Sequence, residues 1–183
     1  MKRNRLFAVS CLVWLGSAHA QHTHGMHGGT VPQSHGGSGY AGLQSRAIKA
    51  LSEQEIADLR AGKGMSMALP AELNGYPGPS HVLELAEPLG LSEAQRTRTE
   101  VLFREMQAQA RAAGEAVIEA ESVLDRLFAE RRATDATLSE AIQRAALARA
   151  RVRATHLRHH LRMLEVLTPE QVFEYKRLRG YRD

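Results

Sequence analysis

The sequence of 183 residues predicts an all-α protein whose main part is an extended antiparallel helical hairpin with short flanking helices. Apolar and small residues recur at alternating steps of 3 and 4 through residues 103–127 and again through residues 147–164, which is typical of a buried helix seam. Between Gly90 and Thr168 the chain has no Pro, and Gly114 is its only Gly. Aromatic residues make up 5% of the chain, which argues against a β-sandwich and suits long helices.

Residues 1–20 have the three parts of a secretory signal peptide. A positively charged start precedes an apolar stretch over residues 6–15, and a small-x-small cleavage site ends at Ala20. The apolar stretch is shorter than a membrane span requires. We therefore expect cleavage after Ala20, export to the periplasm and no membrane span.

Removal of residues 1–20 changes the composition of what remains. The signal peptide holds the only Cys, so the exported chain forms no disulfide although its compartment would allow one. It also holds three of the 24 Lys and Arg and none of the 20 Asp and Glu, so the exported chain carries about +1 rather than +4. This near balance of charge, together with export, argues against nucleic acid as a partner.

The region before the hairpin divides into two parts by composition. Residues 21–39 are rich in Gly, Ser and His, and we expect them to form a disordered His/Gly-rich tail. Residues 40–90 are expected to hold short helices and turns. One helix is predicted to start after Ser52, whose side chain can form a capping box, and to end at Gly62. A second short helix is predicted over residues 81–86.

The helical hairpin domain is expected over residues 91–183. Its first helix is predicted over residues 93–132 and its second over residues 138–166, with Thr137 and Glu140 forming the capping box of the second. A short connection makes two long helices antiparallel neighbours. The apolar bulk is too small for a deep core, so a thin shape or a dimer is expected. The predicted seams consist of Phe103, Met106, Ala110, Ala113, Val117, Ala120, Leu124 and Leu127 on the first helix and Leu147, Ala150, Ala154, Leu157, Leu161 and Leu164 on the second.

A phrase with the pattern Leu-Ser/Thr-x-x-Gln occurs twice, at residues 91–95 and 167–171. In each copy the hydroxyl side chain can cap a helix while the Gln side chain reaches back to it. Pro169 suits a first helical turn, because its missing N–H has no partner there. The second phrase therefore predicts a last helix over about residues 169–179.

The export signal, the all-helical pattern and the two Leu-Ser/Thr-x-x-Gln phrases resemble those of the Spy/CpxP family of periplasmic stress chaperones and heavy-metal resistance or sensor proteins. The resemblance covers about residues 85–180, and the first phrase has Ser92 where Thr is usual. It implies a cradle-shaped homodimer of antiparallel hairpins. It also implies an ATP-independent chaperone for unfolded or misfolded periplasmic proteins, a regulator of envelope-stress signalling, or a metal binder.

One sector of the second long helix carries side chains that can bind a metal, namely His156, His159, His160 and Met163. A His pair at i, i+4 spacing, such as His156 and His160, can supply two ligands to one ion. Imidazole suits Cu, Zn and Ni, and a thioether favours Cu(I). A complete site needs further donors from another helix or subunit. The alternative is a solvated basic face whose histidines are merely polar.

The predicted tail contains a second set of histidines, His22, His24, His27 and His35. A flexible His-rich segment can wrap around Cu or Zn at low affinity, because binding must order the chain. The alternative is a polar spacer without a ligand.

Arginines form another sector of the second long helix, which holds six Arg and no acid from Arg144 to Arg162. An Arg row beside a Leu row can bind unfolded chains, because charge assists the encounter and apolar contact prolongs it. The candidate client-binding residues are Arg144, Arg151, Arg158, Arg162, Leu157 and Leu161. The alternative is a solvated face whose arginines pair with acids on the first helix, such as Glu115, Glu119 and Glu121.

These features predict a binding protein rather than an enzyme. The sequence shows no Gly-rich phosphate loop after a strand and no Ser-His-Asp set on a strand scaffold. The leading interpretation is a periplasmic stress-protective chaperone with accessory Cu, Zn or Ni binding. The alternative is a heavy-metal buffer or sensor accessory without chaperone activity, and a third is a structural partner of a membrane sensor kinase or metal efflux system.

Overall fold

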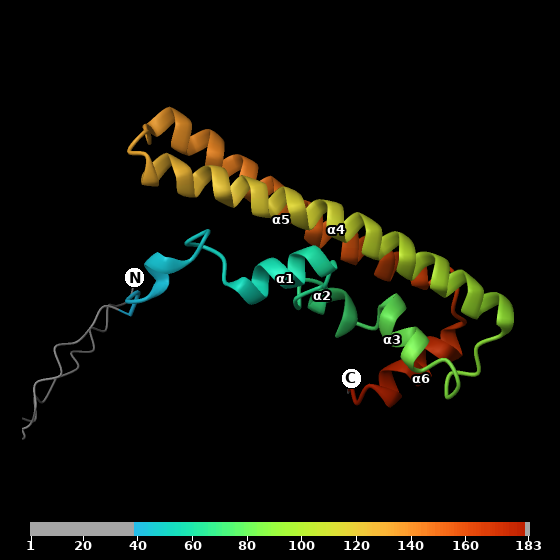
Figure 1. The fold of residues 1–183 in the computed structure, drawn as a ribbon. Coiled ribbons are helices and arrows are strands. Elements are labelled where there is room, and N and C mark those ends of the chain that lie inside the picture. The colour runs from blue at the N-terminus through green and yellow to red at the C-terminus, as the bar shows by residue number, and fades with distance from the viewer. Residues whose placement is uncertain (1–38, 182–183) are drawn as a thin grey trace, which may run out of the picture. The chain divides into compact units, whose positions relative to one another are not determined.

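The computed structural model describes residues 39–181, and every regular element over that range is a helix (Figure 1). The predicted all-α class with a long hairpin is confirmed. The predicted signal peptide and all but the last residue of the predicted tail lie outside the described residues. Within residues 39–181, none of the helices combines the length and the hydropathy that a membrane span requires. In chain order the elements are η1 (Leu43–Ser45), α1 (Glu53–Ala61), α2 (Leu69–Glu72), α3 (Pro79–Glu84), α4 (Glu93–Ala129), α5 (Asp135–Met163) and α6 (Pro169–Leu178).

The hairpin consists of α4 and α5, which run antiparallel side by side (Figure 1). They contain 37 and 29 residues and are therefore about 55 and 43 Å long. Two ion pairs fix their register: Arg149 lies 2.8 Å from Glu121, and Arg162 lies 2.6 Å from Glu105. The predicted seam of α4 is buried at Met106, Ala110, Val117 and Ala120, as expected.

The turn between α4 and α5 differs from the prediction. Arg131, just after α4, has a left-handed backbone with φ 54°, which reverses the chain. The side chain of Thr134 then accepts a hydrogen bond from the backbone N–H of Thr137, and Thr137 returns the bond. The predicted capping role of Thr137 with Glu140 is wrong, because Thr134 is the cap and α5 starts three residues earlier than predicted.

The face of α5 that packs inward is not the predicted Leu seam. The side chains of Leu147 and Leu161 are 54% and 56% exposed. Both stripes step along the helix by 3 and 4, so spacing alone does not distinguish them. Side-chain size decides, because three alanines let α5 approach α4 closely. The inward face consists of Ala141, Ala145, Ala148, Val152, Thr155, His156, His159, His160 and Met163.

The two Leu-Ser/Thr-x-x-Gln phrases meet in space. Each forms the predicted capping box, at the start of α4 and of α6. In addition the side chains of Gln95 and Gln171 hydrogen-bond to each other in both directions, at 2.7 and 3.1 Å. Their remaining amide N–H groups donate to the backbone carbonyls of Val166 and Leu89. The phrases therefore cap two helices and also hold the start of α6 against the start of α4.

The short helices agree with the prediction in part. α1 begins after Ser52 with the expected capping box and ends at Gly62, as predicted. α3 begins at Pro79, two residues before the predicted start, because Pro79 occupies the first helical turn after Gly78. α2 has no counterpart in the prediction.

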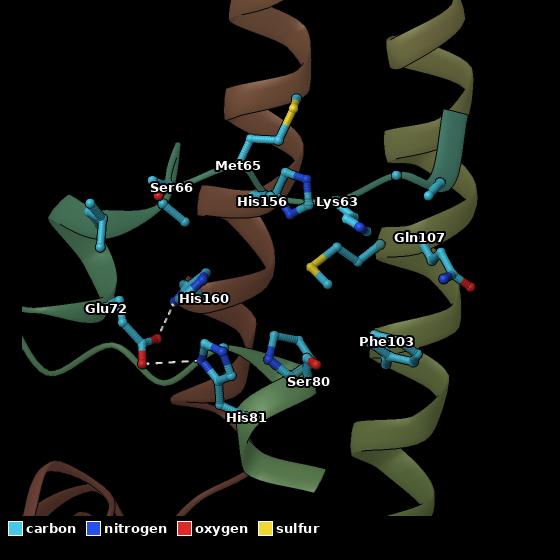
Figure 2. A pocket seen from close by; sticks show the side chains of 18 residues that line it. Lys63, Met65, Ser66, Glu72, Ser80, His81, Phe103, Gln107, His156 and His160 are labelled. Atoms are coloured by element: carbon cyan, nitrogen blue, oxygen red, sulfur yellow. Dashed lines mark hydrogen bonds and ion pairs between the residues drawn. The ribbon is translucent and has the colours of Figure 1, made fainter. Parts of the chain in front are cut away.

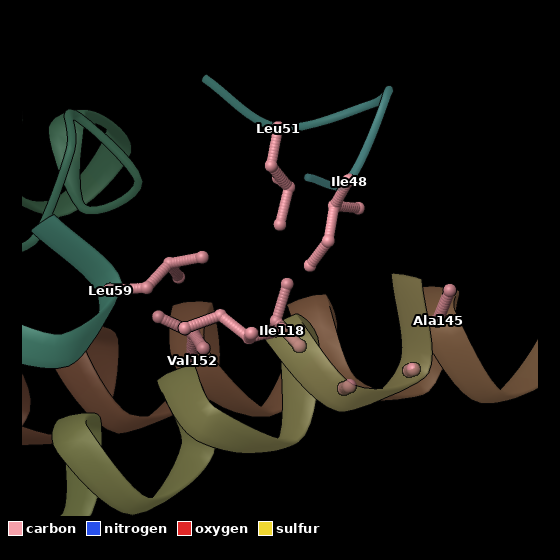
Figure 3. Packing of buried hydrophobic residues seen from close by; sticks show 9 residues of the cluster. Ile48, Leu51, Leu59, Ile118, Ala145 and Val152 are labelled. Carbon is pink, nitrogen blue, oxygen red and sulfur yellow. The ribbon is translucent and has the colours of Figure 1, made fainter. Parts of the chain in front are cut away.

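The segment before the hairpin packs along one side of it (Figure 1), with α1 and α3 on α4 and with α2 and α3 on α5. Figure 3 shows Ile48, Leu51 and Leu59 of this segment facing Ile118 and Val152 of the long helices. α1 approaches α4 closely at a glycine, because a Cβ on Gly114 would lie 2.3 Å from the Leu59 carbonyl oxygen. These contacts bring the chain between α1 and α3 against α5, where the candidate site lies.

Candidate metal centre

A pocket of about 480 Å³ opens between the chain from Ala61 to His81 and the long helices α4 and α5 (Figure 2). Groups with metal-binding chemistry line it from five segments, namely the α1–α2 loop, α2, α3, α4 and α5. Three are imidazoles, two are thioethers and one is a carboxylate. We define the histidine pocket by these six residues: His81, His156, His160, Met65, Met106 and Glu72.

α5 and one loop build the wall of the histidine pocket. His156 and His160 are four residues apart on α5 and therefore lie on the same side of that helix. The loop between α1 and α2 lies against His156, and within it Met65 and Ser66 have left-handed φ values of 44° and 62°. This conformation is costly for residues that have a side chain, and such strain concentrates at binding sites. The strained loop therefore marks this pocket as a functional candidate.

His160 is buried and oriented by the backbone. Its Nδ1 lies 2.6 Å from the carbonyl oxygen of Tyr76, and because a carbonyl only accepts, Nδ1 donates and the lone pair of the neutral ring is on Nε2. A Cβ on Gly78 would lie 3.0 Å from this Nε2, so glycine leaves the space beside it open. A histidine whose other nitrogen donates to a carbonyl is typical of metal ligands.

His156 is also buried, at 4% exposed. Burial lowers its pKa, and the imidazoles of His160 and His159 lower it further. A backbone hydrogen bond with Lys63 acts in the opposite direction, as expected when the ring N–H donates to a carbonyl. Burial therefore favours the uncharged imidazole of His156, and its Nε2 is a buried atom without a hydrogen-bond partner.

Glu72 is buried beside His160 and His81 (Figure 2). Its Oε1 accepts hydrogen bonds from Tyr175 at 2.5 Å, Tyr181 at 2.9 Å and His81 Nδ1 at 3.2 Å. Burial alone would raise the pKa of Glu72, but these three hydrogen bonds outweigh it and bring the pKa to about 2. Its Oε2 has no hydrogen-bond partner and lies 3.8 Å from His160 Nδ1. One oxygen of Glu72 thus fixes the C-terminal segment, and the other remains unpaired.

Two unpaired atoms therefore belong to the histidine pocket. Among the described residues, Glu72 Oε2 and His156 Nε2 are the buried side-chain N and O atoms without a hydrogen-bond partner. Buried polar groups nearly always have a partner. Both atoms offer lone pairs, so the group that would complete them is a metal ion or a hydrogen-bond donor.

The ligands that the histidine pocket offers fit a soft ion better than zinc. A zinc site takes three or four ligands from His, Cys and carboxylates. Residues 39–181 contain no group of three or more His, Cys, Asp and Glu placed to hold one ion. Two imidazoles with a thioether from Met65 or Met106 match the preference of Cu(I) for soft ligands.

The structure brings together only part of the predicted α5 ligand set. His156 and His160 line the histidine pocket, but His159 does not. The ring of His159 is occupied, because Nδ1 donates to the Thr155 carbonyl at 2.8 Å and Nε2 lies 3.4 Å from a donor nitrogen of Arg162. Met163 is buried in a separate apolar cluster with Leu102, Tyr175 and their neighbours. The tail residues His22, His24, His27 and His35 lie outside the described residues.

Four residues of the histidine pocket were not predicted: Glu72, His81, Met65 and Met106. Met106 belongs to the predicted helix seam, and the sequence favours a core or incidental role for the loop residue Met65 over metal binding. Glu72 and His81 reach α5 across more than 70 residues of sequence. The available signal was the Gly-rich loop at Gly62 and Gly64 and the turn before α3, which mark a folded-back segment but not its contact with α5.

The predicted client-binding residues separate into two groups. Arg144, Arg151 and Arg158 are exposed and form no ion pair within the described part of the chain, whereas Arg162 pairs with Glu105. Leu161 is exposed and Leu157 is partly buried. Of the three acids predicted as alternative partners of the α5 arginines, only Glu121 pairs with one, Arg149. Glu115 pairs instead with Arg60, and Glu119 with Arg126.

Comparison with known proteins finds no match to this chain among protein-family models, curated proteins or solved structures.

Proposed function

We propose that the protein binds a soft transition-metal ion, Cu(I) above all, in the histidine pocket and serves as a metal buffer or sensor accessory in the periplasm. The observation that carries this proposal is the pair of buried, unpaired atoms, His156 Nε2 and Glu72 Oε2, in one pocket. Export to the periplasm follows from the predicted signal peptide over residues 1–20. The proposed role is binding, not catalysis.

The residues of the histidine pocket would have different roles in binding the ion. His160 would bind the ion through Nε2, because its Nδ1 donates to the backbone carbonyl of Tyr76, and His156 would bind it through its unpartnered Nε2. A thioether of Met106 or Met65 would complete a coordination that suits Cu(I). The charge of Glu72, which is retained at neutral pH because the pKa of Glu72 is about 2, would stabilise the cation nearby.

The direct test is Cu(I) affinity of the full exported chain against a competing chelator under reducing conditions. The double variant His156→Gln/His160→Gln should weaken binding by about 100-fold or more, since it removes both nitrogen ligands. Met106→Leu should weaken it by a smaller factor. Met163→Leu is the matched control, because Met163 is also buried but lies in another cluster, and it should leave the affinity unchanged.

The tail histidines provide the second control. Replacing His22, His24, His27 and His35 by Ala should leave the tight site intact. If that variant loses tight Cu(I) binding while His156→Gln/His160→Gln retains it, the tail is the metal site and the proposal for the pocket is wrong.

A second candidate function is protein binding by the outward face of α5, as the chaperone interpretation requires. The observation in its favour is that three leucines and several unpaired arginines share this exposed face. Large exposed apolar patches bordered by polar groups are typical of binding surfaces. The test is suppression of aggregation of an unfolded substrate by the wild type and by Leu157→Ser/Leu161→Ser. Equal suppression by both proteins would exclude this face.

A further inference from the structure

The outward face of α5 carries a complete heptad stripe. We define the outer seam as Leu147, Ala150, Ala154, Leu157, Leu161 and Leu164, whose spacing alternates 3 and 4. Leu147, Leu161 and Leu164 are 54%, 56% and 39% exposed, although leucines at this spacing normally pack against another helix. Among the described residues no helix covers these leucines, since the short helices α1, α2 and α3 pack along another side of the hairpin (Figure 1).

The spacing of the outer seam selects the form of its partner. A 3–4 repeat presents one straight apolar line over five turns of helix, and the surface that matches it is a second helix with the same repeat. An extended chain places side chains with a period of 2 and does not match this line. The geometry favours a helical partner over an unfolded chain.

The charges beside the outer seam select the chemistry of its partner. Arg144, Arg151 and Arg158 follow one another at intervals of seven and lie along one edge of the seam, while Arg153 lies along the other. These four arginines are exposed and pair with no acid among the described residues, in contrast to Arg149 and Arg162, which pair with acids of α4. Positions that flank a heptad seam determine partner choice through charge. The complementary helix therefore carries acids at its flanking positions.

The same charges argue against a second copy of α5. In a parallel pair the row with Arg151 and Arg158 would face Arg153 of the partner copy, and in an antiparallel pair this row would face itself. Either arrangement places like charges opposite each other without an acid between Arg144 and Arg162 to relieve them. A homodimer would therefore use another face.

We infer that the outer seam docks an acidic amphipathic helix of another protein. This inference rests on the second candidate function, protein binding by the outward face, and names the class of partner. The probe is a synthetic helical peptide of three heptads with Leu at its seam positions and Glu at its flanking positions, compared with the same peptide carrying Lys at those flanks. Binding to the full exported chain is followed by fluorescence anisotropy.

The Glu peptide should bind at least tenfold more tightly than the Lys peptide, and high salt should reduce the difference. Leu157→Ser/Leu161→Ser should weaken binding of the Glu peptide at least tenfold without changing the helix content. Arg151→Glu/Arg158→Glu should reverse the preference between the two peptides. Phe173→Ser is the matched control, because Phe173 is also an exposed apolar residue but lies on α6, and it should have no effect.

Three outcomes would overturn the inference. The first is the absence of binding by either peptide together with no binding of an unfolded protein, which would also remove the second candidate function. The second is displacement of the Glu peptide by reduced, carboxymethylated α-lactalbumin at similar concentration. Protein binding by the face would then stand, but its partner would be an unfolded chain. The third is self-association of the wild type that Leu157→Ser/Leu161→Ser abolishes, which would make a second copy the partner.

Discussion

The two faces of α5 are the reverse of what hydrophobicity alone would predict, because the buried face holds polar side chains and the exposed face holds leucines. The inward face contains three histidines and Thr155 among alanines, whereas the outward face contains leucines. The polar groups are tolerated inside because most have partners: Thr155 donates to the Arg151 carbonyl, His159 to the Thr155 carbonyl and His160 to the Tyr76 carbonyl. Small alanines between them let the helices approach closely. The comparison shows that helix distance and hydrogen bonding, more than hydropathy, determine which face of this helix is buried.

The same charge placed on each face of α5 should have very different effects on stability. Val152→Asp buries an unpaired carboxylate in the inward face and should destabilise the protein by about 4 kcal/mol. Leu161→Asp places it on the outward face and should change stability by less than about 0.5 kcal/mol. Urea unfolding of both variants measures the difference. Equal losses would show that the outward face is also buried, for example in an oligomer.

The next largest effect concerns the carboxylate beside the inward histidines. The pKa of Glu72 is about 2 in the folded protein against an ordinary 4.5, so the stability it contributes is complete above pH 4.5 and is lost as pH falls toward 2. The shift corresponds to a loss on the order of 3 kcal/mol. Glu72→Gln should remove this part of the pH dependence, whereas Glu140→Gln, at an exposed position, should not. Urea unfolding at pH 6 and pH 3 provides the measurement, and parallel losses in wild type and Glu72→Gln would contradict the assigned hydrogen bonds.

A smaller effect is expected where α1 rests on α4. Gly114→Ala should destabilise the protein by about 2 kcal/mol, because the new Cβ collides with the Leu59 backbone and outweighs the gain of about 1 kcal/mol in helix propensity. Gln109→Ala on the exposed side of α4 is the control and should be neutral or slightly stabilising. Thermal unfolding followed by circular dichroism compares them. A stabilised Gly114→Ala variant would mean that α1 does not lie there.

The smallest effect is expected from the hydrogen bonds between Gln95 and Gln171, which join the two Leu-Ser/Thr-x-x-Gln phrases. Gln95→Ala and Gln171→Ala should each cost about 1 kcal/mol through the lost capping and cross-helix hydrogen bonds. Because the two amides bind each other, the double variant should lose less than the sum of the single losses, by at least about 0.5 kcal/mol. Strict additivity in chemical denaturation would indicate two independent caps.

The fold could be predicted from the sequence to a large extent, because caps and helix seams are local signals. Ser52, Ser92 and Thr168 cap their helices as predicted, and the long hairpin follows from the repeat. The inward face of α5 could not be predicted, because the Leu stripe and the Ala/His stripe have the same spacing. The turn was misplaced because Thr134 and Thr137 are both good caps, and the choice depends on the preceding backbone.

Only the part of the candidate site that lies on a single helix, α5, could be predicted from the sequence. His156 and His160 share a face of α5 by spacing, and the structure places both in the histidine pocket. The partners that orient them, Tyr76 and Lys63, and the neighbour Glu72 come from a segment whose contact with α5 depends on tertiary packing. Local sequence patterns contain no record of that contact, and for the same reason they could not separate His159, whose ring is already bonded, from its neighbours.

Binding of Cu(I) by His156 and His160 can be followed residue by residue with long-range ¹H–¹⁵N NMR of the imidazoles as the full exported chain is titrated with Cu(I). We expect the Nε2 resonances of His156 and His160 to shift together at one equivalent of Cu(I), while the resonances of both His159 nitrogens stay unchanged. Unchanged resonances of His156 and His160 at one equivalent, with the ion taken up elsewhere in the chain, would contradict the proposed site.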